Sequence, residues 1–254
     1  MTHRLLPLLL CLPFAVLRGA DDARPAPEKT RHYSARQVFS YAQPLLFKAD
    51  FGSASSLDSW ELSEDDRYRI NQATPERLQI VEAPGLGPGR KAVRFAVPRA
   101  PNSFRAEISL PYEKGFQERW YAERLLIPED WVIDPGKGND IVMQWHAIPG
   151  NGKPTYPNLE ISVGGSHWFI RQSFGIAHPD PTRTNRKLDD EVKPGVWVRW
   201  VIHAKWSPNA DGLLEIWKDG KQVAALKGPN VYSSIGEEYT PYLKTGTSQT
   251  QGLK

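Results

Sequence analysis

The chain has 254 residues, of which 24 % are charged and 40 % are hydrophobic, as is ordinary for a globular protein with a core. Its formal net charge is +3, and its single cysteine, Cys11, lies close to the N-terminus. These values argue against a strongly basic nucleic-acid binder, and they exclude disulfides within the chain and cysteine-based sites beyond Cys11.

Residues 1–20 have the pattern of an export signal. A polar start that includes Arg4 is followed by an apolar run over 5–17, which is too short to span a bilayer as a mature helix, and then by small residues up to Ala20. We therefore predict a secreted or periplasmic protein with no membrane association after cleavage. Removal of this segment leaves 30 basic against 29 acidic residues, so an anionic partner must be held by a local cluster of cations.

Residues 21–44 are polar and contain prolines, and we predict a linker with a short helix over 35–41. From residue 45 the sequence changes to short β-prone runs that alternate with turn-rich breaks. No internal repeat and no second change of composition follow, so residues 45–254 are predicted to form one domain.

Ten segments in this domain are predicted as strands, because β-branched and aromatic residues are concentrated between turn-forming residues. These segments are 78–83, 92–97, 104–110, 120–127, 141–148, 159–163, 168–173, 197–205, 213–218 and 222–226. Asp219-Gly220 between the last two is a strong hairpin signal. Many short strands without alternating helices predict an all-β fold, a two-sheet antiparallel β-sandwich of the concanavalin-like jelly-roll kind.

Three segments carry polar pairs two residues apart, a spacing that puts both side chains of a strand on one face. The pairs are Arg105 and Glu107, Gln144 and His146, and Tyr242 and Lys244. Each pair by itself is more often a solvated strand face than a site. Polar groups inside otherwise apolar strands are costly to bury, so together the pairs favour a groove in contact with water.

The ordered set Arg-x-Glu-Ile, Gln-x-His and Tyr-Leu-Lys-x-Gly resembles the jelly-roll polysaccharide lyases, which include heparin lyase I-like enzymes and alginate lyases. The spacing is most similar to the heparin lyase I-like family, and the resemblance covers roughly residues 45–246. It implies β-elimination in an acidic polysaccharide: a base removes the C5 proton of a uronic acid, the carboxylate charge is neutralised, and a donor protonates the leaving oxygen.

The resemblance also implies roles for the polar residues. His146 would be the base or a carboxylate contact, depending on the stereochemistry of the sugar. Gln144 and Arg105 would bind and neutralise the carboxylate, and Glu107 would orient Arg105 rather than act as an acid. Lys244 would help to hold anionic groups, and Tyr242 shares its face and is predicted to contact substrate.

One position departs from the family pattern. A tyrosine normally follows the lysine by four positions and serves as the general acid, but Ser248 stands there. The following tail is polar and shows no strand pattern, so the last strand is expected to be truncated. Since a serine hydroxyl is a poorer proton donor than a phenol, catalysis is expected to be impaired; Tyr156, Tyr232, Tyr239 and Tyr242 are possible substitutes.

Two alternatives remain open from the sequence. A non-catalytic, lectin-like sandwich could bind a glycan with the same face, and Ser248 favours it. A jelly-roll glycoside hydrolase is disfavoured, because it needs paired carboxylates and Glu160 stands alone. His167, His178 and His203 lack metal-ligand spacing, so we expect no cofactor; structural calcium is not indicated, and a monomer is the default expectation. A basic segment, Asn185-Arg186-Lys187 with Arg183, is interpreted as a loop that could meet sulfate or carboxylate groups, although such a loop is more often merely solvated.

Overall fold

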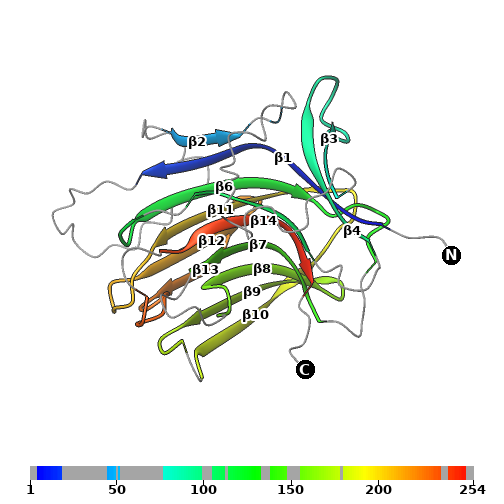
Figure 1. Ribbon diagram of the computed structural model, residues 1–254. Coiled ribbons are helices and arrows are strands. Elements are labelled where there is room, and N and C mark those ends of the chain that lie inside the picture. The colour runs from blue at the N-terminus through cyan, green and yellow to red at the C-terminus, as the bar shows by residue number, and fades with distance from the viewer. Residues whose placement is uncertain are drawn as a thin grey trace.

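The structure is a computed structural model that describes residues 5–18, 45–49, 51, 77–98, 105–111, 114–132, 138–147, 155–177, 180–235 and 240–249. The strands in these ranges form two sheets, and neighbouring strands in both sheets pair antiparallel (Figure 1). The predicted all-β jelly-roll sandwich is therefore confirmed. The described part of the chain includes no helix long and apolar enough to cross a membrane.

The larger sheet has eight strands. Its order is β13 (Lys221–Lys227), β12 (Leu213–Lys218), β11 (Trp197–Lys205), β6 (Glu118–Leu126), β1 (Leu5–Arg18), β4 (Lys91–Pro98) and β3 (Leu78–Glu82), and β2 (Leu45–Ala49) pairs with β1. The predicted hairpin joins β12 to β13, where Asp219 and Gly220 both have positive φ, as a type I′ turn requires.

The smaller sheet has six strands and carries the polar pairs predicted from the sequence. Its order is β10 (Thr182–Glu191), β9 (His167–Phe174), β8 (Leu159–Gly164), β7 (Asp140–His146), β14 (Tyr242–Gln249) and β5 (Arg105–Ser109). Strands β14 and β7 are far apart in the sequence but adjacent in the sheet (Figure 1).

The hydrophobic core lies between the two sheets and is rich in tryptophan. Trp145 and Trp168 from the smaller sheet, and Trp200 and Trp206 from β11 and the residue that follows it, are almost fully buried. Trp168 and Trp200 meet edge to face, with ring centroids 5.3 Å apart. Much of the aromatic content of the chain therefore belongs to the core.

Two predictions about local structure were wrong. The basic segment interpreted as a loop lies in strand β10, which among the described strands pairs with β9 alone and therefore forms an edge of this sheet. Its side chains are exposed except Leu188, so it lacks the polar–apolar alternation that reveals a strand. The polar tail after Gly246 continues β14 through Gln249, because it pairs with β5 and with β7.

The segment predicted as an export signal forms β1, which lies between β4 and β6 in the larger sheet. The pairing of residues 5–18 in this sheet does not test whether residues 1–20 are removed. The export signal therefore stays a prediction. The short helix predicted over 35–41 lies outside the described residues.

A buried glutamate connects the two sheets behind β14. Glu123 of β6 accepts a hydrogen bond of 2.6 Å from the Thr245 hydroxyl, and its second carboxyl oxygen has no hydrogen-bond partner among the described residues. Burial raises the pKa of Glu123 to about 8, and the Thr245 bond only partly opposes this rise. Glu123 is therefore protonated, and neutral, at pH 7.

Glu123→Gln is expected to stabilise the protein at neutral pH. The folded chain keeps the Glu123 proton up to pH about 8, whereas an unfolded glutamate loses it near 4.5, so wild-type stability falls as pH rises between these values. The uncharged amide removes this loss, worth roughly 3 kcal/mol at pH 7. Urea unfolding at pH 4.5 and 7.5 measures it, with exposed Glu82→Gln as the control; equal gains at both pH values would contradict the explanation.

Candidate functional site

Side chains of the smaller sheet alternate between the core and its outer face. Ala106 and Ile108, Met143 and Trp145, and Leu243 belong to the core cluster. Their neighbours in each strand therefore point to the outer face, the face directed away from the larger sheet. Arg105, Glu107, Gln144, His146, Tyr242 and Lys244 are such neighbours, on the adjacent strands β5, β7 and β14.

The register aligns one polar row across the whole sheet. Each member lies directly opposite the next on the neighbouring strand, so their side chains share a face. From β5 to β10 the row is Ser109, Lys244, Gln144, Glu160, Arg171 and Asn185. Two of the predicted residues, Lys244 and Gln144, thus lie side by side at its centre.

A second contact crosses β14 where that strand has no side chain. Glu107 of β5 lies opposite Gly246 and accepts a hydrogen bond from the Gln144 amide of β7, on the far side of β14. The same carboxylate pairs with Arg105, whose Nε is 3.4 Å from Glu107 Oε2. Glu107 therefore connects Arg105 to Gln144.

These residues are less open to solvent than a groove in contact with water requires. Glu107, Gln144 and Lys244 expose only 2, 3 and 4 % of their surface, whereas the Arg105 side chain is 28 % exposed. The prediction of a groove in contact with water was therefore wrong for these residues, which form a partly covered polar cluster. Buried polar groups of this kind need partners, and the Gln144–Glu107 bond supplies one.

His146 is held as a neutral imidazole. Burial, followed by the charges of Lys244 and Arg105, lowers its pKa to about 3. Its Nε2 lies 3.1 Å from the Thr155 carbonyl oxygen, which can only accept, so Nε2 carries the proton. Nδ1 then has a free lone pair, and it is buried without a hydrogen-bond partner among the described residues.

The tyrosines near this face differ in their suitability as proton donors. Tyr242 lies opposite His146, and its ring centroid is 5.6 Å from Lys244 Nζ. Tyr232 donates its hydroxyl to the Tyr156 carbonyl oxygen at 2.8 Å, and burial raises its pKa to about 12. Tyr239 lies outside the described residues. Ser248, at the position that differs from the family pattern, lies opposite Arg105.

Two further residues continue the row and were not among the site residues predicted from the sequence: Glu160 and Arg171. Arg171 Nη1 donates to Glu160 Oε1 at 2.9 Å, and Arg171 Nε donates to Asn185 Oδ1 at 3.3 Å. Burial raises the pKa of Glu160 above its ordinary value, and Arg171 opposes the rise. The alternation of Trp168-Phe169-Ile170-Arg171 is a signal that could have placed Arg171 on the polar face.

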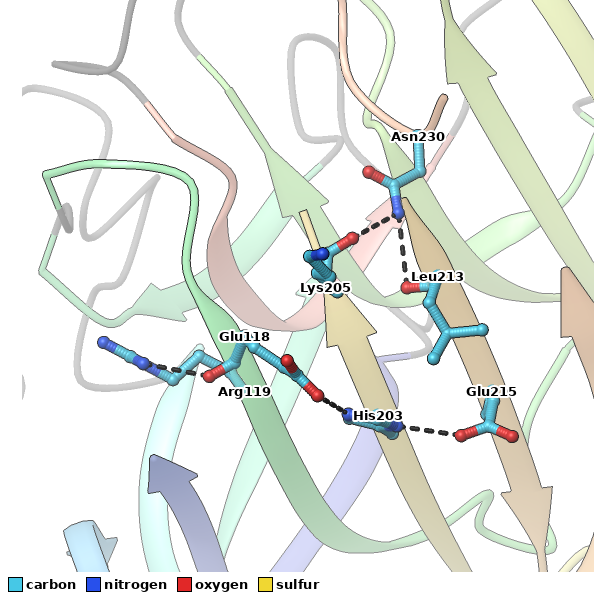
Figure 2. A network of polar contacts seen from close by, with 7 residues as sticks. All are labelled: Glu118, Arg119, His203, Lys205, Leu213, Glu215 and Asn230. Carbon is cyan, nitrogen blue, oxygen red and sulfur yellow. Dashed lines mark hydrogen bonds and ion pairs between the residues drawn. The ribbon is translucent and has the colours of Figure 1, made fainter. Parts of the chain in front are cut away.

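His203 belongs to a separate cluster on the larger sheet (Figure 2). Glu118 and Glu215, from the strands on either side, contact its two ring nitrogens at 2.7 and 2.8 Å, and Trp120 stacks on its ring at 4.0 Å between centroids. Burial alone would lower the pKa of His203, but the bonds to both carboxylates outweigh it and raise the pKa. His167 contacts Ser166, and His178 is outside the described residues.

Among the residues that the structure describes, no group of three or more His, Cys, Asp or Glu side chains could hold a metal ion. Glu118 and Glu215 approach opposite edges of the His203 ring, so they cannot converge on one ion with it. That cluster is therefore best described as a histidine between two carboxylates, which favour its protonated form.

The family model described as "Polysaccharide lyase" matches residues 49–251. The chain therefore belongs to the polysaccharide lyase family. The match does not separate a heparin lyase I-like branch from other lyases, so that finer assignment stays a prediction. A search of curated proteins found no significant match.

One solved lyase shares the fold, and two others align with lower scores. The endo-β-1,4-glucuronan lyase of the fungus Trichoderma reesei aligns with a TM-score of 0.57 and 22 % identity, over 76 % of this chain and 82 % of that chain. A family 7 alginate lyase, A1-II′, aligns with a TM-score of 0.41 and 12 % identity, over 61 % of this chain and 67 % of that chain. An alginate lyase of Pseudomonas aeruginosa aligns with a TM-score of 0.38 and 17 % identity, over 61 % of this chain and 69 % of that chain. The first of these similarities supports the jelly-roll fold.

The pKa values of His146 and His203 are expected to lie on opposite sides of the ordinary value of 6.5. His146 should stay neutral from pH 8 down to about 4, whereas the midpoint of the His203 titration should lie above 6.5. Side-chain ¹⁵N chemical shifts measure both titrations, with His146→Ala and His203→Gln used for assignment. A midpoint near 6.5 for either ring would contradict its described environment.

Gly246→Ala is expected to destabilise β14, because it disturbs the close packing of Gly246 against the backbone of Ala106 and Glu107. Gly246 has φ of 145°, and an added Cβ would lie 2.7 Å from Glu107 Cα and closer still to the Ala106 carbonyl oxygen. We expect a loss of about 1–3 kcal/mol in urea unfolding.

Gly165→Ala is the matched control, because Gly165 also has positive φ but its Cβ would meet nothing within 4 Å. If both variants lose the same stability, backbone strain alone explains the effect and the close approach at Gly246 does not matter.

Proposed function

We propose that the protein cleaves an acidic, uronate-containing polysaccharide by β-elimination. Membership of the polysaccharide lyase family gives the general activity. The observation that carries the finer proposal is the grouping, on three adjacent strands, of two cations, an amide and a neutral histidine: Arg105, Lys244, Gln144 and His146. β-Elimination at a uronic acid needs this combination around one carboxylate.

His146 Nδ1 is the proposed base for the C5 proton. It carries no proton at neutral pH, and the Thr155 carbonyl fixes the tautomer that leaves Nδ1 free. Part of the low pKa comes from Lys244 and Arg105. A bound uronate carboxylate would offset these charges and raise the basicity of His146 as the substrate arrives.

Arg105, Gln144 and Lys244 are proposed to neutralise the charge that develops on the C6 carboxylate. Fixed donors are most effective in a site with little water, where charge interactions are strong. Glu107 accepts from Gln144 and pairs with Arg105, so its proposed role is to position both. Tyr242 lies opposite His146 and is proposed to contact the sugar.

Proton donation to the leaving oxygen is expected to be the slow step of the proposed reaction. Ser248 occupies the position where a tyrosine would act, and an aliphatic hydroxyl is a much weaker acid than a phenol. Tyr232 is a poor substitute, since its hydroxyl is already donated and its pKa is raised to about 12. We therefore propose slow turnover.

A non-catalytic glycan-binding protein is the second candidate. The observation that favours it is Ser248 on the same face as Arg105 and Lys244. The same cations would hold an acidic glycan, and the bond at C4 would stay intact. The two candidates differ in product formation, not in binding.

Incubation with alginate, polyglucuronate and heparan sulfate, monitored by the ultraviolet absorbance of the unsaturated uronate product, tests the proposal. We expect a slow rise with one polymer that His146→Ala abolishes. Ser248→Tyr should increase the rate by about 10²–10⁴-fold, the usual contribution of a general acid. Ser248→Phe, with the same ring and no hydroxyl, is the control. Binding of all three polymers without product from wild type or Ser248→Tyr would favour the glycan-binding protein.

A further inference from the structure

The outer face of the smaller sheet stays cationic beyond the proposed reaction centre. Arg183 of β10 lies opposite Ser173 of β9, and Lys187 of β10 lies opposite Phe169 of β9. Ser173 and Phe169 are on the same strand and face as Arg171. Directly opposite residues share a face, so Arg171, Arg183 and Lys187 form one group over β9 and β10. Arg183 and Lys187 are exposed.

The negative charge in this group is already compensated. Glu160 is buried and pairs with Arg171 at 2.9 Å. Three cations therefore face one carboxylate, and two of the cations, Arg183 and Lys187, come from the edge strand. Asp189 and Asp190 lie within the irregular part of β10, between Lys187 and Glu191, and Asp190 pairs with Lys218 of β12.

Aromatic rings accompany these cations. The Arg183 guanidinium carbon lies 3.7 Å from the centroid of the Tyr156 ring, and Tyr156 is 39 % exposed. Phe169 is partly exposed, and the Arg171 guanidinium carbon lies 5.9 Å from its ring centroid. A guanidinium that stacks on a ring is held in one orientation while its edge stays available to an anion. An apolar ring beside a fixed cation suits an acidic sugar, which offers a C–H face and a carboxylate.

This group lies several strands away from Lys244 in the same sheet. From β14 to β9 there are three strand spacings, or roughly 14 Å. A polymer that crosses the strands at Lys244 would next meet Arg171 and then Arg183. A single sugar at the reaction centre would reach neither.

We propose that Arg171, Arg183 and Lys187, with Tyr156 and Phe169, form a second subsite for a carboxylate-bearing sugar of the same polysaccharide chain, remote from the bond that is cut. The proposal rests on the proposed function for the identity of the polymer. It makes long polyuronates better ligands than short ones, because only they span both cation groups.

Binding of polyglucuronate and alginate to Arg183→Gln tests the subsite. Arg183 is exposed, so its loss leaves the core intact. Arg186→Gln is the matched control: it removes the same charge from the same strand, but Arg186 lies opposite the core residue Ile170 and points to the other face. Neutral dextran is the control ligand, and circular dichroism verifies the fold of both variants.

We expect Arg183→Gln to raise the Kd for long polyuronate by about tenfold, the usual effect of one lost charge-assisted contact, and to reduce its salt dependence. Arg186→Gln should change the Kd by less than about twofold. Equal affinities of the two variants, or no binding of polyuronate by wild type, would overturn the subsite. Because binding is measured without cleavage, a weakened Arg183→Gln supports the subsite even if no product forms, and product formation with equal affinities leaves the proposed function intact.

Discussion

The position of β14 between β5 and β7 is the constraint on which the candidate site depends. Hydrogen bonds to both neighbours place Lys244 beside Gln144 and Ser248 beside Arg105. On the other face of the strand, Thr245 bonds to Glu123 in the core. A slip of one residue would exchange these faces, burying Lys244 between the sheets and expelling Thr245. The core contact and the site therefore fix each other.

Burial and the neighbouring side chains together set the protonation states on which the proposed chemistry relies. Glu123 meets only a hydroxyl, and burial raises its pKa to about 8, so it keeps its proton at pH 7. Burial also raises the pKa of Glu160, but Arg171 opposes that rise. His146 shares its surroundings with two cations and loses its proton. His203 is also buried, but it lies between two carboxylates that raise its pKa. The partners, rather than burial alone, decide the state of each group.

Strand β10 shows how one composition can serve two purposes. Charged side chains protect an edge strand from pairing with other chains. On the face that β10 shares with Arg171, the same charges extend the cationic surface away from Lys244. An edge strand without apolar alternation is difficult to identify by periodicity, which explains why it was interpreted as a loop.

The sequence by itself determined the sandwich, most strand positions and the pairing of polar residues on each strand, because turn residues and the period of two are local properties. It also identified Ser248 as the departure from the family pattern. Only the tertiary structure decided that three distant strands are neighbours, that Glu107 reaches Gln144 over Gly246, and that Arg171 continues the polar row. Those facts depend on strand order and register, which long-range hydrogen bonds set and no local pattern encodes.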